Sequence, residues 1–181
     1  TIRKLCMRGN KIDDIAAESL SNMLRINNTC DDLDLGENML GFDCCHVLGE
    51  GIEVNRALKS LSVDSNQLNA AGNMPIKAFV QGICLNTSLR VLIMDGNSLG
   101  SEWGYQLAGA LARNNTLVQV SFRDNHLDDR AGKALLKAFT HAPFLLELAL
   151  TADEIGTTVW DQFKRVFSRK RSVVDPSHEA Q

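Results

Sequence analysis

The chain has 181 residues, a formal net charge of −3 and an apolar fraction of 44%, which is ordinary for a folded protein in water. Both signs of charge are spread along the sequence, so no overall field would recruit nucleic acid or an anionic membrane. No apolar run approaches the roughly 18 residues of a spanning helix, and the first residues do not resemble a secretory leader. We therefore expect a cytoplasmic protein with no nucleic-acid partner and no membrane insertion.

The five cysteines are odd in number and lack a C-x-x-C spacing. This disfavours both a disulfide framework and a zinc ribbon, and a reducing compartment is the simpler interpretation. The sequence predicts no metal and no cofactor.

From the first residues onward, one polar slot recurs at intervals of 28, 28, 31, 28 and 28 residues. The slot is filled in turn by Asn10, Asn38, Asn66, Asn97, Asn125 and Asp153. Apolar residues keep fixed places around it in the frame L-x-x-L-x-L-x-x-N-x-L, the signature of leucine-rich repeats. Six coils therefore start near residues 2, 30, 58, 89, 117 and 145. Because Thr1 opens directly on a strand with no cap, we expect the chain to be the tail portion of a longer solenoid.

Within each coil, the alternating L-x-L segment predicts a short strand, and the stretch that follows predicts an amphipathic helix. Counted from the slot, positions plus 6, 10, 13 and 14 are apolar or small, which traces one side of a helix. In the third coil this count assigns Ile76, Phe79 and Val80 to the buried face. The three extra residues of that coil are expected to bulge around Gly72–Pro75.

At the end of the chain, bulky Trp160, Phe163 and Phe167 occupy the last predicted helix. We predict a capping helix over about residues 157–170, a repeat domain over 1–171 and a frayed tail over 172–181. The basic run between Lys164 and Ser172 is the polar face of that helix, or else a nuclear-import patch, a site for an acidic partner or a phosphorylation point at Ser168; the helix face is favoured.

Together these elements predict an α/β fold: a right-handed solenoid of about six coils with a parallel concave sheet and convex helices. The slot asparagine suits the turn after each strand, because an amide side chain both donates to and accepts from buried backbone groups. N-x-[ST] sequons at Asn27, Asn86 and Asn114 fall at one point of the repeat, so repeat chemistry explains them without glycosylation.

The coil length and helical return segments, such as Leu111–Leu117 and Ala131–Leu135, resemble leucine-rich repeats of the ribonuclease-inhibitor type. Asparagine in five consecutive slots makes the chain more similar to the Ran GTPase-activating protein, tropomodulin and capping-regulator branch. The resemblance implies a non-enzymatic module that grips a partner protein. It also leaves open a regulator of a small GTPase, or a cytoskeletal scaffold with cytoskeletal or nuclear association. The basic C-terminal end is unlike the acidic tail expected of a Ran regulator.

Outward-pointing strand positions form the natural binding surface, since inward positions are used by the core. The candidate partner-binding residues are Lys4, Arg8, Asp32, Asp34, Ser60, Ser62, Asp64, Val91, Ile93, Asp95, Gln119, Ser121, Arg123, Glu147 and Thr151. Val91 and Ile93 either anchor a partner or merely suit a strand.

The aspartates of this row come from separate coils with no histidine or nucleophile beside them, so a solvated acidic patch is favoured over catalysis. Cys44 and Cys45 fall on buried helix positions, which argues against a metal site with His46. Cys6 faces outward between Lys4 and Arg8, which suggests a reactive thiol. No phosphate loop, nucleophile elbow or H-E-x-x-H pair is present, so the sequence predicts no catalytic residues.

Overall fold

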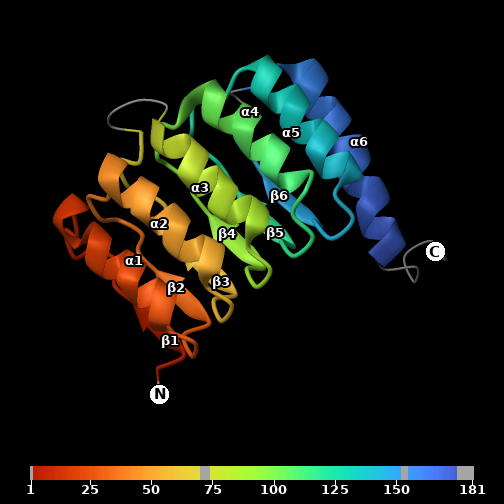
Figure 1. The fold of residues 1–181 in the computed structure, drawn as a ribbon. Coiled ribbons are helices and arrows are strands. Elements are labelled where there is room, and N and C mark those ends of the chain that lie inside the picture. Colours follow the sequence, from red (N-terminus) through yellow and green to blue (C-terminus); the bar gives the residue numbers. More distant parts are fainter. Residues whose placement is uncertain (1, 70–73, 152–154, 175–181) are drawn as a thin grey trace.

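The computed structural model describes residues 2–69, 74–151 and 155–174, and within them it has two layers, a sheet and a row of helices (Figure 1). Six parallel strands lie side by side in chain order. The strands are β1 (Lys4–Cys6), β2 (Asp32–Asp34), β3 (Ser60–Ser62), β4 (Val91–Ile93), β5 (Gln119–Ser121) and β6 (Glu147–Ala149). The helices are α1 (Ala17–Ile26), preceded by a 3-10 turn η1 (Asp14–Ala16), α2 (Phe42–Val54), α3 (Met74–Leu85), α4 (Gly100–Leu111), α5 (Asp129–His141) and α6 (Thr157–Val174). The predicted alternation of strand and helix is confirmed.

The register of the sheet places equivalent residues of successive coils beside one another. Leu5 is opposite Leu33, Leu33 is opposite Leu61, and Leu61 is opposite Leu92. The middle residue of each strand points into the interior, where Leu33, Leu61, Leu92 and Val120 have no exposed surface. Because side chains alternate along a strand, the two flanking residues point to the opposite face of the sheet. That face carries the candidate binding row.

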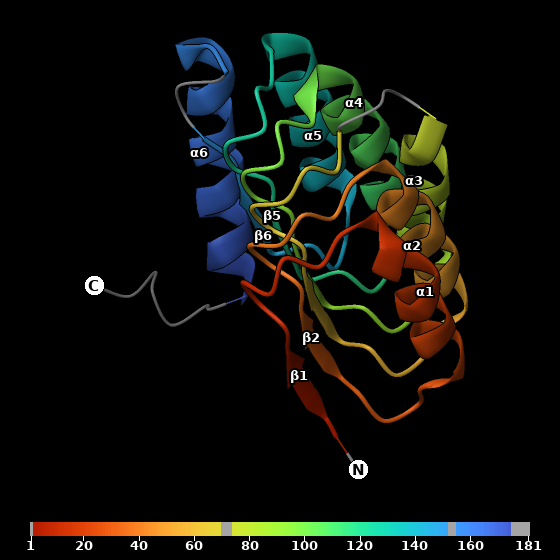
Figure 2. The ribbon, with the colours of Figure 1, turned by 90° about the vertical axis from the view of Figure 1, so that its left-hand side faces the viewer.

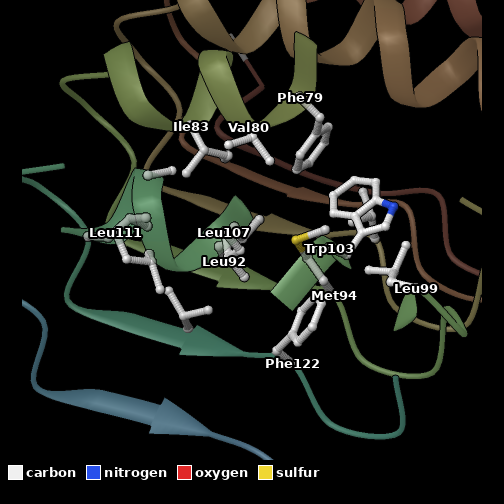
Figure 3. Close-up of a cluster of buried hydrophobic side chains, with 14 of the residues drawn as sticks. Phe79, Val80, Ile83, Leu92, Met94, Leu99, Trp103, Leu107, Leu111 and Phe122 are labelled. Atoms are coloured by element: carbon white, nitrogen blue, oxygen red, sulfur yellow. The ribbon is translucent and has the colours of Figure 1, made fainter. Parts of the chain in front are cut away.

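The core lies between the two layers and runs the length of the array. Figure 3 shows one section of it, where Phe79 of α3 and Trp103 of α4 approach each other above Met94 and Phe122, which directly follow β4 and β5. The two aromatic ring centroids are 5.9 Å apart and tilted by 59°. Full burial of such a side chain stabilises the fold by roughly 1.5–3 kcal/mol, so this section is a major source of stability.

In the third coil the predicted helix register is wrong by three residues. Ile83 is buried and occupies the place that Ile52 has in the previous coil. The hydrogen bonds show this equivalence: Asn114 donates to the carbonyl of Ile83, just as Asn86 donates to the carbonyl of Ile52. Phe79 and Val80 are buried as predicted, but they hold earlier positions of the helix. The three additional residues precede this part of the chain, so every later offset shifts. The side chain of Ile76 and residues 72 and 73 lie outside the described part of the structure.

The slot asparagines form a ladder inside the turns that follow the strands. Asn38 Nδ2 donates to the carbonyl of Met7 in the previous coil and to that of Leu35 in its own, at 3.0 and 2.9 Å. Its Oδ1 accepts from the backbone N–H of Asn10 at 2.9 Å. The same donation recurs at Asn66, Asn97 and Asn125. Each of these four amides thus joins two coils. The sequence predicted the pairing with backbone groups of the turn but not the link between coils; Asp153 lies outside the described residues.

A second ladder runs along the C-terminal ends of the helices, through the sequon residues Asn86 and Asn114 and through Asn55, which holds the same point of the repeat. Asn86 Nδ2 donates to the carbonyls of Ile52 and Asn55 at 2.7 and 3.0 Å, and its Oδ1 accepts from the N–H of Leu89 at 2.6 Å. Asn55 and Asn114 make the equivalent bonds. Asn86 and Asn114 are also buried, which supports a structural role for these side chains.

The last position of this ladder is occupied by a lysine. Ala142 follows Asn114 by 28 residues and has no amide, and Lys170 follows Ala142 by another 28. Lys170 Nζ donates to the carbonyls of Ala142 and Leu145, each at 2.8 Å, and lies 4.3 Å from the ring centroid of Phe139. Partial burial lowers the pKa of this ammonium. The sequence did not distinguish Lys170 from the other cations of the basic run.

The C-terminal helix α6 ends at Val174, four residues beyond the predicted end of the capping helix. Val159 and Phe163 are buried, and the ring of Phe167 stacks on Phe139 with centroids 6.2 Å apart. Residues 175–181 of the predicted tail lie outside the described residues, and the capping role remains a prediction. Among the described helices, none is long and apolar enough to cross a bilayer.

Candidate functional site

The candidate surface is the face of the sheet opposite the helices, which Figure 2 shows from the N-terminal side of the array. Ten of the fifteen predicted residues lie in two parallel rows. The register aligns Lys4, Asp32, Ser60, Val91, Gln119 and Glu147 in one row and Asp34, Ser62, Ile93 and Ser121 in the other. The other five each lie two residues after the end of a strand; they are Arg8, Asp64, Asp95, Arg123 and Thr151. Most members are exposed or half-buried. Asp64 and Ser121 are the exceptions, with exposed fractions of 9% and 6%.

An ion cluster centred on Arg8 organises the N-terminal half of this face. The Arg8 guanidinium donates to both carboxylate oxygens of Asp64, two coils away, at 2.8 and 2.5 Å. It also reaches Asp34 at 3.3 Å and Glu37 at 3.1 Å. A planar guanidinium is suited to such forked contacts. The acidic patch predicted here is therefore partly neutralised from within the protein.

The backbone between these partners leaves room for the guanidinium. Gly36 lies beneath Arg8, and a Cβ built on it would collide with Arg8 Nη1 and with Asp64 Oδ1. Asp64 accepts additional bonds from Ser62 Oγ at 2.5 Å and Ser65 Oγ at 3.3 Å. The Arg8 hydrogen bonds hold the pKa of Asp64 below its usual range. Asp64 is thus a structural carboxylate, ionised near neutral pH.

At the centre of the face, Val91 and Ile93 of β4 are half-buried and apolar. Their register partners on β3 are Ser60 and Ser62, and on β5 they are Gln119 and Ser121. The structure thus surrounds two aliphatic side chains with polar ones. This arrangement resembles the apolar centre and polar rim of protein interfaces.

The C-terminal half is also tied together by bonds between coils. Asp95 accepts from Ser121 Oγ at 2.8 Å and from the N–H of Arg123 at 2.7 Å. Thr151 Oγ1 accepts from the N–H of Asp124 and donates to its carboxylate, at 2.7 and 2.9 Å. These contacts fix the positions of the side chains along the face.

A cavity of about 410 Å³ lies beside β6, where the face meets α6. Its lining combines apolar Leu148, Trp160 and Phe163 with the exposed Arg123 and Glu147. Arg123 and Glu147 were predicted as binding residues, whereas the contribution of α6 was missed. The comparison of equivalent positions between coils does not show how the last helix, α6, lies against the last strand, β6.

Cys44 and Cys45 pack in the core, whereas Cys6 lies on the surface. Cys44 and Cys45 have no exposed surface, and burial raises the pKa of the Cys44 thiol to about 12. Cys6 is exposed, and its Sγ lies 3.7 Å from Asp34 Oδ2. The thiol of Cys6 therefore contacts a carboxylate, whereas the sequence suggested flanking cations. In the described ranges no cluster of three or more His, Cys, Asp or Glu side chains is arranged to hold a metal ion.

Comparison with known proteins supports the assignment of the repeat. A family model described as "Leucine Rich repeat" matches residues 113–136. The bovine (Bos taurus) protein "NACHT, LRR and PYD domains-containing protein 3" is 28% identical over 155 residues, covering 71% of this chain. The match spans only 15% of that relative's length.

Two solved structures share the fold. The C-terminal domain of tropomodulin from Caenorhabditis elegans is 15% identical with a TM-score of 0.68, covering 91% of this chain and 99% of that one. A structure titled "Leiomodin-1 Actin-Binding Site 2" is 14% identical with a TM-score of 0.57, covering 99% and 89% of the two chains. At this level of identity the similarity concerns the fold alone.

Proposed function

We propose that this chain, a leucine-rich-repeat protein, is a non-enzymatic interaction module that binds a partner protein through the concave strand face. The observation that carries the proposal is the organisation of that face. Ion pairs and hydrogen bonds between coils hold its polar side chains in place, and Val91 and Ile93 remain accessible at its centre. A surface ordered before binding loses less side-chain entropy on association.

A binding role is favoured over catalysis because two carboxylates of the face, those of Asp64 and Asp95, are already engaged. Asp64 is bound by Arg8 and two serines, and Asp95 by Ser121 and a backbone N–H. A general base needs a free acceptor poised near neutral pH, whereas the pKa of Asp64 is lowered. These carboxylates position neighbouring side chains.

The surface is tested by substitution with a matched control. Ile93→Arg places a charge at the apolar centre, whereas Leu85→Arg makes the same kind of change at an exposed site at the end of α3. Loss of one interface anchor costs about 2 kcal/mol, or roughly 30-fold in affinity. The partner recovered from cell extract by affinity capture should be lost with Ile93→Arg and kept with Leu85→Arg. Equal recovery by both variants would exclude the concave face.

A second candidate, a cytoskeletal scaffold, is favoured by the fold shared with tropomodulin and with the leiomodin structure titled as an actin-binding site. Co-sedimentation with filamentous actin at low ionic strength tests it directly. The scaffold role predicts that the chain pellets with filaments, and Ile93→Arg should then reduce the pelleted fraction more than Leu85→Arg. A chain that stays in the supernatant at every actin concentration would remove this candidate and leave the general binding role intact.

A further inference from the structure

The helix layer lies on the opposite side of the molecule from the strand face (Figure 1). It carries a groove between α4 and α5. It has a volume of about 570 Å³. Its floor consists of the small residues Ala108, Gly109 and Ala112 of α4 and its C-terminal cap, and Ala134 and Ala138 of α5. A Cβ built on Gly109 would meet no atom within 4 Å, so the space above it is open.

Basic side chains line the α5 side of the groove. Arg130, Lys133, Lys137 and His141 follow one another at steps of three, four and four residues, which places them on one side of the helix. The lining contains no carboxylate. Within the described residues, neither Lys133 nor Lys137 forms an ion pair.

One end of the groove is closed by an ordered aromatic contact. Tyr105 of α4 is 47% exposed, and the Arg130 guanidinium lies 4.9 Å from its ring centroid. A cation over an aromatic face holds both side chains in place. At the other end, His141 Nδ1 lies 2.7 Å from the carbonyl oxygen of Lys137. The cationic side of the groove is therefore partly ordered before any ligand binds.

These features fit one class of ligand. We propose that the α4–α5 groove docks an acidic amphipathic helix of a partner protein, with its apolar side on the alanine floor and its carboxylates against Lys133 and Lys137. A small-residue floor lets a third helix approach closely, and the two lysines supply charge complementarity for acidic side chains.

Two other anionic ligands fit the groove less well. A bilayer is bound by apolar side chains that protrude into it, whereas this floor is recessed and built from alanine and glycine. Single-stranded nucleic acid is bound by stacking on free aromatic rings, whereas Tyr105, the aromatic residue of the lining, is already covered by Arg130. This site is distinct from the strand face and does not depend on the function proposed for it.

The test uses a fluorescein-labelled peptide of about 18 residues, long enough for five helical turns, with leucine at every third or fourth position and glutamate elsewhere. Its affinity for the whole chain is measured by fluorescence anisotropy at low salt. The variant K133E/K137E should weaken binding by about tenfold or more. The control K59E/K77E changes the net charge equally, at exposed lysines of other coils, and should leave the affinity within about twofold.

A third variant, Gly109→Leu, fills the floor without altering charge. It should weaken binding by about tenfold while leaving the unfolding temperature unchanged or raised, because leucine favours a helix more than glycine. The proposal is overturned if the glutamate peptide does not bind, if K59E/K77E weakens it as much as K133E/K137E, or if a lysine-for-glutamate peptide binds equally well. Binding to phosphatidylserine vesicles in place of the peptide, abolished by K133E/K137E, would assign the groove to a membrane surface and equally overturn it.

Discussion

Replacement of Asn66 by alanine tests the asparagine ladder in the middle of the array. Asn66 Nδ2 donates to the carbonyls of Leu35, Val63 and Asp64 at 3.0–3.1 Å, and Oδ1 accepts from the N–H of Leu40 at 3.0 Å. The amide has two hydrogens, so the three carbonyls share two donors. Alanine thus removes the equivalent of three hydrogen bonds and leaves buried backbone groups without a partner.

At about 1 kcal/mol for each bond, Asn66→Ala should lower the free energy of unfolding by roughly 3 kcal/mol. For a urea dependence of about 2 kcal/mol/M, the unfolding midpoint falls by roughly 1.5 M. The assay is urea unfolding followed by far-UV circular dichroism and by tryptophan fluorescence, which reports on buried Trp103 and half-buried Trp160.

The matched control is Asn10→Ala, which changes the same slot in the first coil. The Asn10 side chain is exposed, and among the described residues its amide donates to the carbonyl of Arg8 at 3.1 Å. This change should cost less than about 1 kcal/mol. The interpretation of the ladder is refuted if both variants lose the same stability.

Three further outcomes are expected. Gly82→Ala should destabilise the fold by about 1–3 kcal/mol, because the added Cβ would collide with the backbone carbonyl of Gly49 in α2. Gly109→Ala should stabilise α4 by up to about 1 kcal/mol, because a Cβ there meets no atom and alanine favours a helix more than glycine. Thermal unfolding of the two variants measures the difference. The lowered pKa of Asp64 means that its stabilising contribution is present above pH ~4 and is lost as the pH falls through the folded-state value. The difference in unfolding free energy between wild type and Arg8→Met should therefore shrink below pH ~4, and a constant difference would argue against the ion pair. A thiol reagent should label no more than two of the five cysteines in the native state, since three are buried, and rapid labelling of all five would contradict the packing.

The repeat could be read from the sequence because its physical requirements recur in every coil. Leucine at the strand centre buries its side chain in the core, and asparagine in the turn pairs with backbone groups. Both residues recur at a fixed distance along the chain. The sheet order, the register and the buried faces follow from that period. The helix positions assigned to Phe79 and Val80 were wrong by three residues, because the offset from the slot was kept constant across the insertion expected around Gly72–Pro75.

Contacts of the candidate face were less predictable. The pairing of Arg8 with Asp64 joins residues 56 positions apart and skips one coil, and it depends on the absence of a side chain at Gly36. The sequence placed Arg8 and Asp64 on the same face, but it did not show how far the Arg8 side chain extends. Similarly, Lys170 replaces an asparagine amide through a long flexible side chain from a helix, a substitution that no residue pattern encodes.

Site-specific photocross-linking from the strand face would show most directly whether this face binds a partner. A photoreactive phenylalanine analogue is placed at Ile93 in one variant and at Leu85 in another, and both are irradiated in cell extract. A concave binding surface predicts a discrete protein adduct from position 93 that is absent from position 85. Adducts from position 85 alone, or equal adducts from both, would contradict the claim that the concave face is the binding surface.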